Sequence, residues 1–325
     1  MGLCHTNPLA SLTTRHQNQS DQVIRSLIYM ADHLSILISG LQCRGYAYTL
    51  LPLLLLLILP GCGVNKTPLI DTPVESQPMQ KSPNPIISGD WWHPAPGLTW
   101  QWQLDEEVDT SLDAEVYDID LYVDQAVIDK LHTHGVKIIC YISVGSWEDK
   151  RPDADQFPAE VLGNDYEGWP GERWLDIRHI DLLASIMQAR LDLCQTKGFD
   201  GVEPDNIDIH DNHTGFPLTY ADQLAYARWL TDAAHARGLA IGLKNAPDMV
   251  TDSLPFFDFA ITEDAFYYGW VDKMLPFIAA GKPVFAAEYT DMDVDFNAAC
   301  TWGQQHNVSF IRKNRILTAF RITCP

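Results

Sequence analysis

The chain has 325 residues, 46% of them hydrophobic, which is enough to bury the core of one or two globular domains. Its formal charge is −21 at pH 7, and because the first 61 residues hold three arginines and two acids, residues 62–325 carry −22. A surface of this sign repels nucleic acid and favours cationic partners.

Residues 1–61 are predicted to be a leader rather than part of the fold. An apolar run extends from Tyr46 to Pro60 after Arg44, and it is shorter than the ~20 residues that a membrane-spanning helix needs. It ends on small residues, as secretory signals do. Met30 is an alternative start, which would make residues 1–29 an upstream misreading.

The end of this run, Leu59-Pro60-Gly61-Cys62, resembles a bacterial lipoprotein signal, in which the cysteine is acylated and becomes the first residue of the mature protein. Cys62 is therefore the predicted lipid anchor, with simple signal-peptide cleavage nearby as the alternative. Residues 62–85 are rich in proline and polar residues, which cannot form a core and predict an extended tether. We expect an exported protein, either an outer-membrane lipoprotein or one located at the cell surface or in the periplasm.

Residues 86–325 are predicted to form one domain in which strands and helices alternate. Helices are expected over 124–134 and 177–197, and from a capping box at Thr219 to a stop at Gly238, whereas 144–176 is expected to be a long loop. The order favours a (β/α)8 TIM barrel over a doubly wound sheet. No glycine-rich phosphate loop follows a strand, which argues against nucleotide chemistry. The eight predicted strands are 99–104, 115–122, 136–143, 199–206, 239–245, 257–264, 282–289 and 308–314.

Polar side chains recur where these strands end, and the active sites of such barrels lie at the carboxyl ends of the strands. Glu203 and Asp205 alternate onto one face of their strand, with Asp205 nearer the mouth. Glu263, two strands further round, would project into the same cavity. Two carboxylates facing each other across a sugar-sized gap are what glycosidic cleavage needs, so Asp205 and Glu263 are the candidate catalytic pair. The residues expected to bind sugar groups beside them are Asp120, Tyr141, Asn206, Lys244, Asn245, Glu288 and Tyr289.

Several of these acids have simpler interpretations. Glu203 is equally well explained as a structural hydrogen-bonding group inside the barrel. Asp208, Asp264 and Asp291 are typical of caps on the following helix. The two histidines of the motif HDNH, residues 210–213, lack partners at metal-ligand spacing, so neither a metal nor another cofactor is predicted.

Four cysteines fall in the predicted domain, and none forms a CxxC pair, which argues against a zinc ribbon. Cys300 and Cys324 flank the last predicted strand, and export permits disulfides. We predict that these two are bridged, which would staple the C-terminus, and that Cys140 and Cys194 are free and buried.

The domain resembles glycoside hydrolase family 114, the endo-α-1,4-polygalactosaminidase-like barrels. The resemblance covers about residues 90–325 and is carried by six blocks in order. They are YDIDLY (117–122), KIICYISVGSWEDKRPD (137–153), GFDGVEPDNID (198–208), TGFPLT (214–219), GLAIGLKN (238–245) and FDFAITED (257–264).

The resemblance implies hydrolysis inside chains of α-1,4-linked galactosamine, a cationic amino-sugar polysaccharide that suits the acidic domain. It places the catalytic aspartate on Asp205 and the catalytic glutamate on Glu263. From its aromatic surroundings we expect Glu263 to have a raised pKa and to act as the general acid. The alternatives are a catalytically silent barrel that binds polysaccharide at the cell surface, and a metal-dependent hydrolase, for which the ligands are missing. We expect a monomer.

Overall fold

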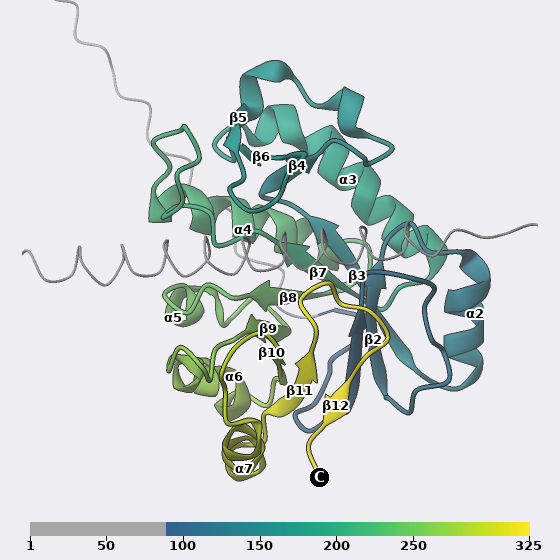
Figure 1. The fold of residues 1–325 in the computed structure, drawn as a ribbon. Coiled ribbons are helices and arrows are strands. Elements are labelled where there is room, and N and C mark those ends of the chain that lie inside the picture. Colours follow the sequence, from purple (N-terminus) through teal and green to yellow (C-terminus); the bar gives the residue numbers. More distant parts are fainter. Residues whose placement is uncertain (1–88) are drawn as a thin grey trace, which may run out of the picture. The chain divides into compact units, whose positions relative to one another are not determined.

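The computed structural model describes residues 89–325, so the predicted leader, Cys62 and the whole tether lie outside the described residues. In the described part, nine strands form one curled sheet, and helices lie around its outer face (Figure 1). A search of residues 89–325 found no helix with the length and hydropathy to span a membrane.

The sheet is a (β/α)8-type barrel in which parallel strands follow one another in chain order, so the predicted fold is confirmed. All eight predicted strands are present, each a little shorter than expected. The parallel strands are β1 (Trp100–Gln103), β2 (Val116–Asp120), β3 (Lys137–Ser143), β7 (Gly201–Asp205), β8 (Ala240–Lys244), β9 (Phe259–Glu263), β10 (Val284–Tyr289) and β11 (Ser309–Lys313), and β12 (Ile322–Thr323) runs antiparallel to β11.

Local signals fix the helix ends. At the start of α4, the Thr219 hydroxyl accepts a hydrogen bond from the Asp222 backbone, and the Asp222 carboxylate accepts one from Thr219, which is the predicted capping box. Gly198 ends α3 with φ of 88°, a conformation that glycine adopts without strain. The helices are α2 (Gln125–Thr133), α3 (Ile180–Lys197), α4 (Tyr220–His235), α5 (Val250–Ser253), α6 (Leu275–Ala279) and α7 (Phe296–His306), with 3-10 turns η1 (Ala154–Gln156), η2 (Ala159–Val161) and η3 (Val271–Met274).

Alternate residues of each strand point into the barrel, and at the amino ends of the strands these residues are apolar. Trp100, Phe259 and Phe285 are at most 1% exposed, and their rings pack against one another. Gly242 makes room for this packing, since a Cβ there would lie 2.2 Å from the Phe259 ring. The amino-terminal half of the barrel is therefore a closed aromatic core.

The segment expected to be a long loop instead contains a second, three-stranded antiparallel sheet in the order β4-β6-β5. Its strands are β4 (Ser146–Glu148), β5 (Leu162–Asp165) and β6 (Glu172–Leu175). They are only three or four residues long, so the sequence shows no sustained alternation that would reveal them. This small sheet follows the carboxyl end of β3 and contributes side chains to the mouth of the barrel.

The C-terminal segment lies between β1 and β11 and fills the seam of the barrel. The backbone N–H of Leu104 donates to the Leu317 carbonyl at 2.9 Å, and the Arg321 guanidinium donates to the Trp100 carbonyl at 2.8 Å. Cys300 and Cys324, the pair expected from the sequence, form a disulfide with Cα atoms 5.3 Å apart, which ties this segment to α7.

The expectation that Cys140 and Cys194 are free thiols is wrong. They form a second disulfide, with Cα atoms 6.1 Å apart and a sequence separation of 54. Cys140 faces outward from β3, and Cys194 lies on the buried face of α3. Their pairing follows from how this helix packs on the sheet, and no local pattern in the sequence could have shown it.

Candidate active site

The ammonium group of Lys244 is the centre of the site at the carboxyl ends of the strands. Its Nζ lies 3.0 Å from Glu203 Oε1, 2.7 Å from Asp205 Oδ1 and 2.9 Å from Glu263 Oε2. It also lies 4.8 Å from the centre of the Trp102 ring. One buried cation therefore binds three carboxylates from two different strands, and Lys244 itself is only 2% exposed.

Asp205 and Glu263 lie at the open side of this cluster. Their side chains are 19% and 23% exposed, whereas Glu203, two residues before Asp205 on the same face of β7, is 0% exposed. The Tyr141 hydroxyl donates to Asp205 Oδ2 at 2.8 Å. The structure thus brings together the predicted pair, with Glu203 one layer deeper as the alternation predicted.

Glu263 is held by its neighbours more tightly than the sequence suggested. Asn245 donates to its carboxylate at 3.1 Å and accepts from its backbone N–H, and the Tyr289 hydroxyl donates to Oε1. Burial favours the neutral carboxyl, but the Lys244 charge and these hydrogen bonds outweigh it, so the pKa of Glu263 lies below its ordinary value. The predicted raised pKa is therefore wrong for the free site, because the sequence did not reveal how many donors surround this carboxylate.

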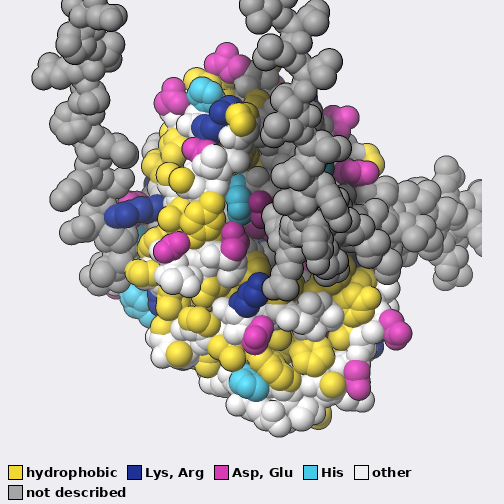
Figure 2. Space-filling model, turned by 90° about the vertical axis from the view of Figure 1, so that its left-hand side faces the viewer, with side chains coloured by type: hydrophobic (Ala, Val, Ile, Leu, Met, Phe, Trp, Pro, Cys, Tyr) yellow, Lys and Arg dark blue, Asp and Glu magenta, His cyan; other side chains and the backbone are white. Residues whose placement is uncertain are grey.

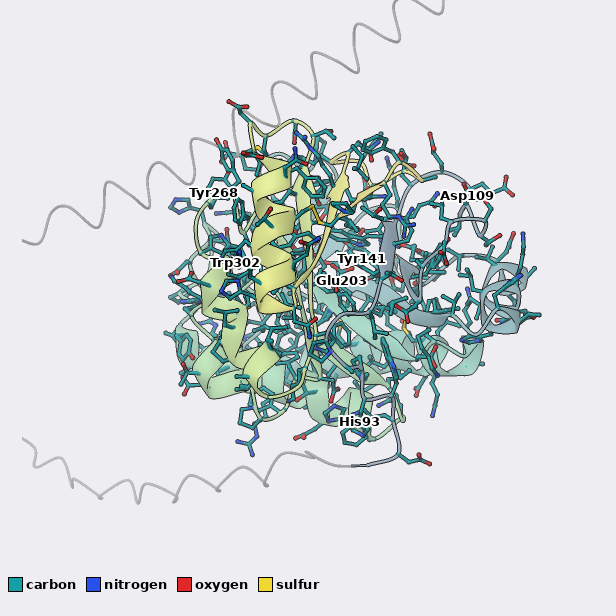
Figure 3. All side chains as sticks on the ribbon, turned by 90° about the horizontal axis from the view of Figure 1, so that it is seen from below. His93, Asp109, Tyr141, Glu203, Tyr268 and Trp302 are labelled. Atoms are coloured by element: carbon teal, nitrogen blue, oxygen red, sulfur yellow. A yellow bond between two sulfur atoms is a disulfide. The ribbon has the colours of Figure 1, made fainter. Side chains whose placement is uncertain are left out.

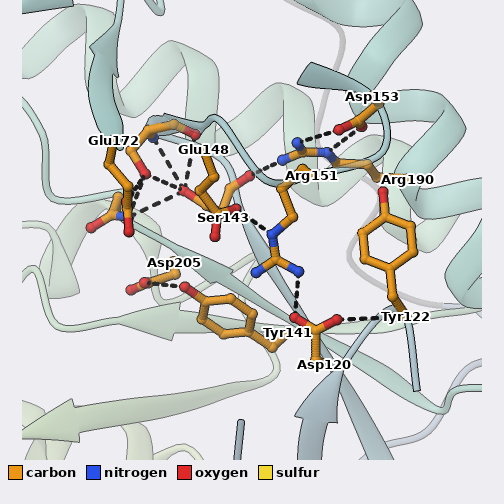
Figure 4. Close-up of polar contacts among 12 residues, drawn as sticks. Asp120, Tyr122, Tyr141, Ser143, Glu148, Arg151, Asp153, Glu172, Arg190 and Asp205 are labelled. Atoms are coloured by element: carbon orange, nitrogen blue, oxygen red, sulfur yellow. Dashed lines mark hydrogen bonds and ion pairs between the residues drawn. The ribbon is translucent and has the colours of Figure 1, made fainter. Parts of the chain in front are cut away.

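Asp120 lies at the rim of the site, where it is bound to a cation that the sequence analysis did not single out. Arg151 donates to Asp120 and, at 2.7 Å, to Glu148 Oε2 (Figure 4). The guanidinium lies 5.7 Å from the centre of the Tyr122 ring and 5.8 Å from that of Tyr141. Tyr122, Tyr141, Glu148 and Arg151 line a small hollow directly beside the hydroxyl that binds Asp205.

The three-stranded sheet adds two acids that the sequence analysis also did not single out. Glu148 and Glu172 are cross-strand neighbours on β4 and β6, and Glu172 accepts from the Ser146 hydroxyl at 2.8 Å. Burial, followed by the charges of Glu148 and Asp205, raises the pKa of Glu172 to about 8. Asp208, expected to be a helix cap, is also near the site, since burial and the Asp205 charge raise its pKa to about 7. Their positions depend on loops whose course the sequence does not specify.

Two residues expected to bind sugar belong instead to the scaffold. Glu288 is fully buried, and its carboxylate accepts from the backbone N–H groups of Phe266 and Tyr267. The reason is alternation, since Tyr289 points into the barrel and Glu288 therefore points out of it. Asn206 is 7% exposed and donates to the Ser143 and Ser146 hydroxyls, which holds the turn between β3 and β4.

Tyr289 and Asp264 are also positioning groups. Tyr289 is 1% exposed, and its ring packs under Arg315, whose guanidinium carbon lies 4.1 Å from the ring centre. Asp264, expected to cap a helix, instead accepts from the Tyr289 backbone at 2.9 Å and from Arg315 at 3.0 Å. Asp291, given the same expectation, pairs with Arg315 as well. This network fixes the tyrosine that binds Glu263.

Within residues 89–325, no three His, Cys, Asp or Glu side chains converge as a group that could hold a metal ion. The histidines of the HDNH motif belong to the loop after β7, where His210 bonds Gln223 through its ring nitrogen at 2.9 Å.

Comparison with known proteins agrees with this geometry. The sequence profile of glycoside-hydrolase family GH114 matches residues 82–325, which is most of the chain. The chain belongs to this family. Among solved structures, the crystal structure of Aspergillus fumigatus Ega3 in complex with galactosamine is similar over 73% of this chain and 100% of that one, with 41% identity and a TM-score of 0.68.

Two further similarities of this GH114 chain are more distant. The glycoside hydrolase domain of PelA from Pseudomonas aeruginosa has a TM-score of 0.54 over 69% of this chain and 98% of that one, but at 13% identity it supports the fold alone. An uncharacterized protein of Deinococcus radiodurans is 29% identical over 178 residues, 47% of this chain. The match spans only 56% of that relative's length.

Proposed function

We propose that this protein is an endo-acting glycosidase that hydrolyses α-1,4-linked galactosamine in exopolysaccharide, with Asp205 and Glu263 as its catalytic carboxylates. The observation that carries the proposal is the pair of partly exposed carboxylates that Lys244 joins at the mouth of a GH114 barrel. The similarity to Ega3, whose crystal structure holds galactosamine, supports the choice of sugar.

Glu263 acts as general acid and base, and Asp205 either attacks the anomeric carbon or activates a water molecule. In the first case, a covalent glycosyl–Asp205 intermediate forms while the Glu263 proton goes to the leaving oxygen, and water then regenerates both groups. In the second, water attacks directly and Asp205 takes its proton. A bound sugar excludes water from Glu263, which raises the pKa of this carboxyl from its low value in the free site.

Charge favours a polymer with free amino groups. The chain carries −21 overall, and acidic side chains are spread over the face shown in Figure 2, where lysine and arginine are sparse. Long-range attraction therefore increases the encounter rate with a cationic chain and weakens with salt. Four further residues are proposed to contact the sugar or the carboxylates around it. Asp120, Tyr141 and Lys244 lie on β2, β3 and β8, and Asn245 directly follows β8.

We also propose that the mature protein begins at Cys62, is lipid-modified there and acts outside the cell, at the outer membrane, on the cell surface or in the periplasm. A lipid anchor with a polar tether would hold the barrel away from the membrane. Cys62→Ala is expected to release the protein in soluble form, measured by fractionation of cells. A variant that stays in the membrane fraction would show that the anchor is something else.

The proposed activity is tested by incubating the purified domain with partly de-acetylated galactosaminogalactan and analysing the products by mass spectrometry. Oligosaccharides of several lengths with galactosamine at the cleaved end are expected, and fully acetylated polymer is the comparison substrate. Polymer that is bound but not cut would identify a silent binding barrel instead. Products that lack galactosamine at the new ends would reject the proposed substrate.

A further inference from the structure

Two carboxyl groups that lie deeper in the barrel than Asp205 and Glu263 are not needed by the two-carboxylate reaction. Asp118, on β2, and Glu203, on β7, are both 0% exposed. Glu203 is the register partner of Tyr141 on β3, and both are labelled near the middle of the molecule in Figure 3. In the described part of the chain, the Lys244 ammonium lies 3.0 Å from Glu203 Oε1, and no other residue outside the pair donates a hydrogen bond to its four oxygens.

The two groups are close enough to hydrogen-bond to each other. Two ionised carboxylates cannot do so, because both are acceptors, whereas a protonated one donates to an ionised one. Burial, followed by the Glu203 charge, raises the pKa of Asp118 well above its ordinary value. Burial also raises the pKa of Glu203, to about 7, although the adjacent Lys244 charge opposes this. Asp118 is therefore the more strongly protonated member.

We infer that Asp118 and Glu203 form a carboxyl pair that holds one proton and one negative charge and that, through Lys244, sets the pH range in which Asp205 and Glu263 are active. The two are positioning residues, since they reach the reacting atoms only through the lysine. The inference rests on the proposed function of that catalytic pair.

The charges around the pair make the single proton important. Among residues 89–325, Lys244 of β8 is the cation in contact with the pair, and Asp205 of β7 and Glu263 of β9 compete for it. The other strands present neutral groups: Trp102, Tyr141 and Tyr289. On β11, Lys313 instead bonds to Gln101 and to the Thr318 carbonyl. A second negative charge on the pair would thus draw Lys244 away from the catalytic carboxylates.

Removing the pair's charge should move the alkaline limb of the pH–rate profile. With less negative charge near Lys244, the lysine stabilises the ionised form of Glu263 more strongly and lowers the pKa of this carboxyl further. At the short distances in this cluster, one unit charge corresponds to a shift of about 1–2 pH units. The alkaline limb would move down, because it follows loss of the Glu263 proton.

The test compares Asp118→Asn, Glu203→Gln and the double variant by their pH–rate profiles on the galactosamine polymer. Each single variant leaves one ionised carboxylate and supplies an amide donor to it, so both profiles are expected to stay close to that of the unaltered protein. The double variant has no charge, and the alkaline limb of its profile is expected to move down by about 1–2 pH units. A shift in either single variant as large as in the double variant would overturn the inference, as would no shift in the double variant.

A second measurement does not depend on activity. A raised carboxyl pKa means that the folded state holds the extra proton, so stability falls as pH rises from the ordinary carboxyl value toward the folded one. In Asp118→Asn, the number of protons released on unfolding over this pH range is expected to be about one smaller than in the unaltered protein. Asp258→Asn is the matched control, since that buried carboxylate bonds to His235 and Trp91 at the other end of the barrel.

The control is expected to lower stability without moving the pH–rate profile. If Asp118→Asn and the unaltered protein release equal numbers of protons on unfolding, the inference of a shared proton is wrong. This outcome can be measured even if the polymer is never cut. Absence of cleavage by the unaltered protein would instead count against the proposed function alone.

Discussion

The two ends of the barrel interior use the same alternating strand positions for opposite kinds of side chain. At the amino ends of the strands, Trp100, Phe259 and Phe285 fill the space with their rings. Two to four residues further along, the inward positions of β7, β8 and β9 hold Glu203, Lys244 and Glu263. The aromatic end is closed by packing, whereas the charged end depends on mutual neutralisation.

The physical difference is in what each end loses when one residue is removed. An apolar side chain leaves a cavity, and the cost depends on how far its neighbours can relax. A charged side chain leaves its partners buried without compensation, and their protonation then makes the cost depend on pH. The cost of losing a side chain is therefore set by packing at one end and by pH-dependent charge compensation at the other, in a single sheet.

The largest expected effect separates chemistry from folding. Asp205→Asn and Glu263→Gln should each lower turnover by about 10³-fold or more, because each removes a group that the transition state requires. Both are near-isosteric, so thermal unfolding and polymer binding should change little. Turnover is measured as new reducing ends. Near-normal activity in either variant would overturn the assignment of that carboxylate.

Lys244→Met should break the charged end. It leaves three carboxylates without their cation, at a cost of about 3–5 kcal/mol near neutral pH, together with loss of activity. Because the pKa of Glu263 is lowered in the fold, its pairing stabilises the protein above the ordinary carboxyl pKa and is lost as pH falls through the folded value. The cost of Lys244→Met, measured by denaturant unfolding, should therefore shrink from pH 7 to pH 4.

Lys313→Met is the matched control for that experiment. Lys313 is also fully buried, but its ammonium bonds to Gln101 and to the Thr318 carbonyl. Burial, then the Arg321 charge, lowers its pKa to about 7, so its contribution to stability changes only as pH rises above that value. A cost of Lys313→Met that changes between pH 4 and pH 7 as much as that of Lys244→Met would contradict the three-carboxylate explanation.

Phe285→Ala should break the aromatic end. The ring packs against Trp100 at 5.3 Å and Phe259 at 6.0 Å between centroids, and its removal should cost about 3–5 kcal/mol. Unlike Lys244→Met, this variant should show the same cost at pH 5 and pH 7 and keep its pH–rate profile. A shifted profile would mean that the two ends of the interior are not independent.

Tyr289→Phe should have the smallest effect. It removes one hydrogen bond to the Glu263 carboxylate and leaves the ring under Arg315 in place. Losing this donor raises the pKa of Glu263, so the alkaline limb of the pH–rate profile should move up and turnover should fall about tenfold. An unchanged alkaline limb would show that Glu263 does not supply the proton.

Much of this arrangement could be predicted because it is encoded locally. The eight strands, the capping box at Thr219 and the common face of Glu203 and Asp205 all follow from short-range periodicity and capping chemistry. Parallel strand order then places the carboxyl ends of the strands together, which is why the sequence could predict that Asp205 and Glu263 lie in one cluster.

Other features were decided only by tertiary structure. Asp118 lies in the middle of a predicted strand and is two residues from Asp120, so alternation could have marked it as inward, but not as a neighbour of Glu203. The lowered pKa of Glu263 and the Cys140–Cys194 disulfide likewise depend on groups from distant segments. The sequence by itself determined which side chains face inward, because backbone geometry is local. The folded chain decided their partners and protonation, because distance and burial depend on residues that are far apart in the sequence.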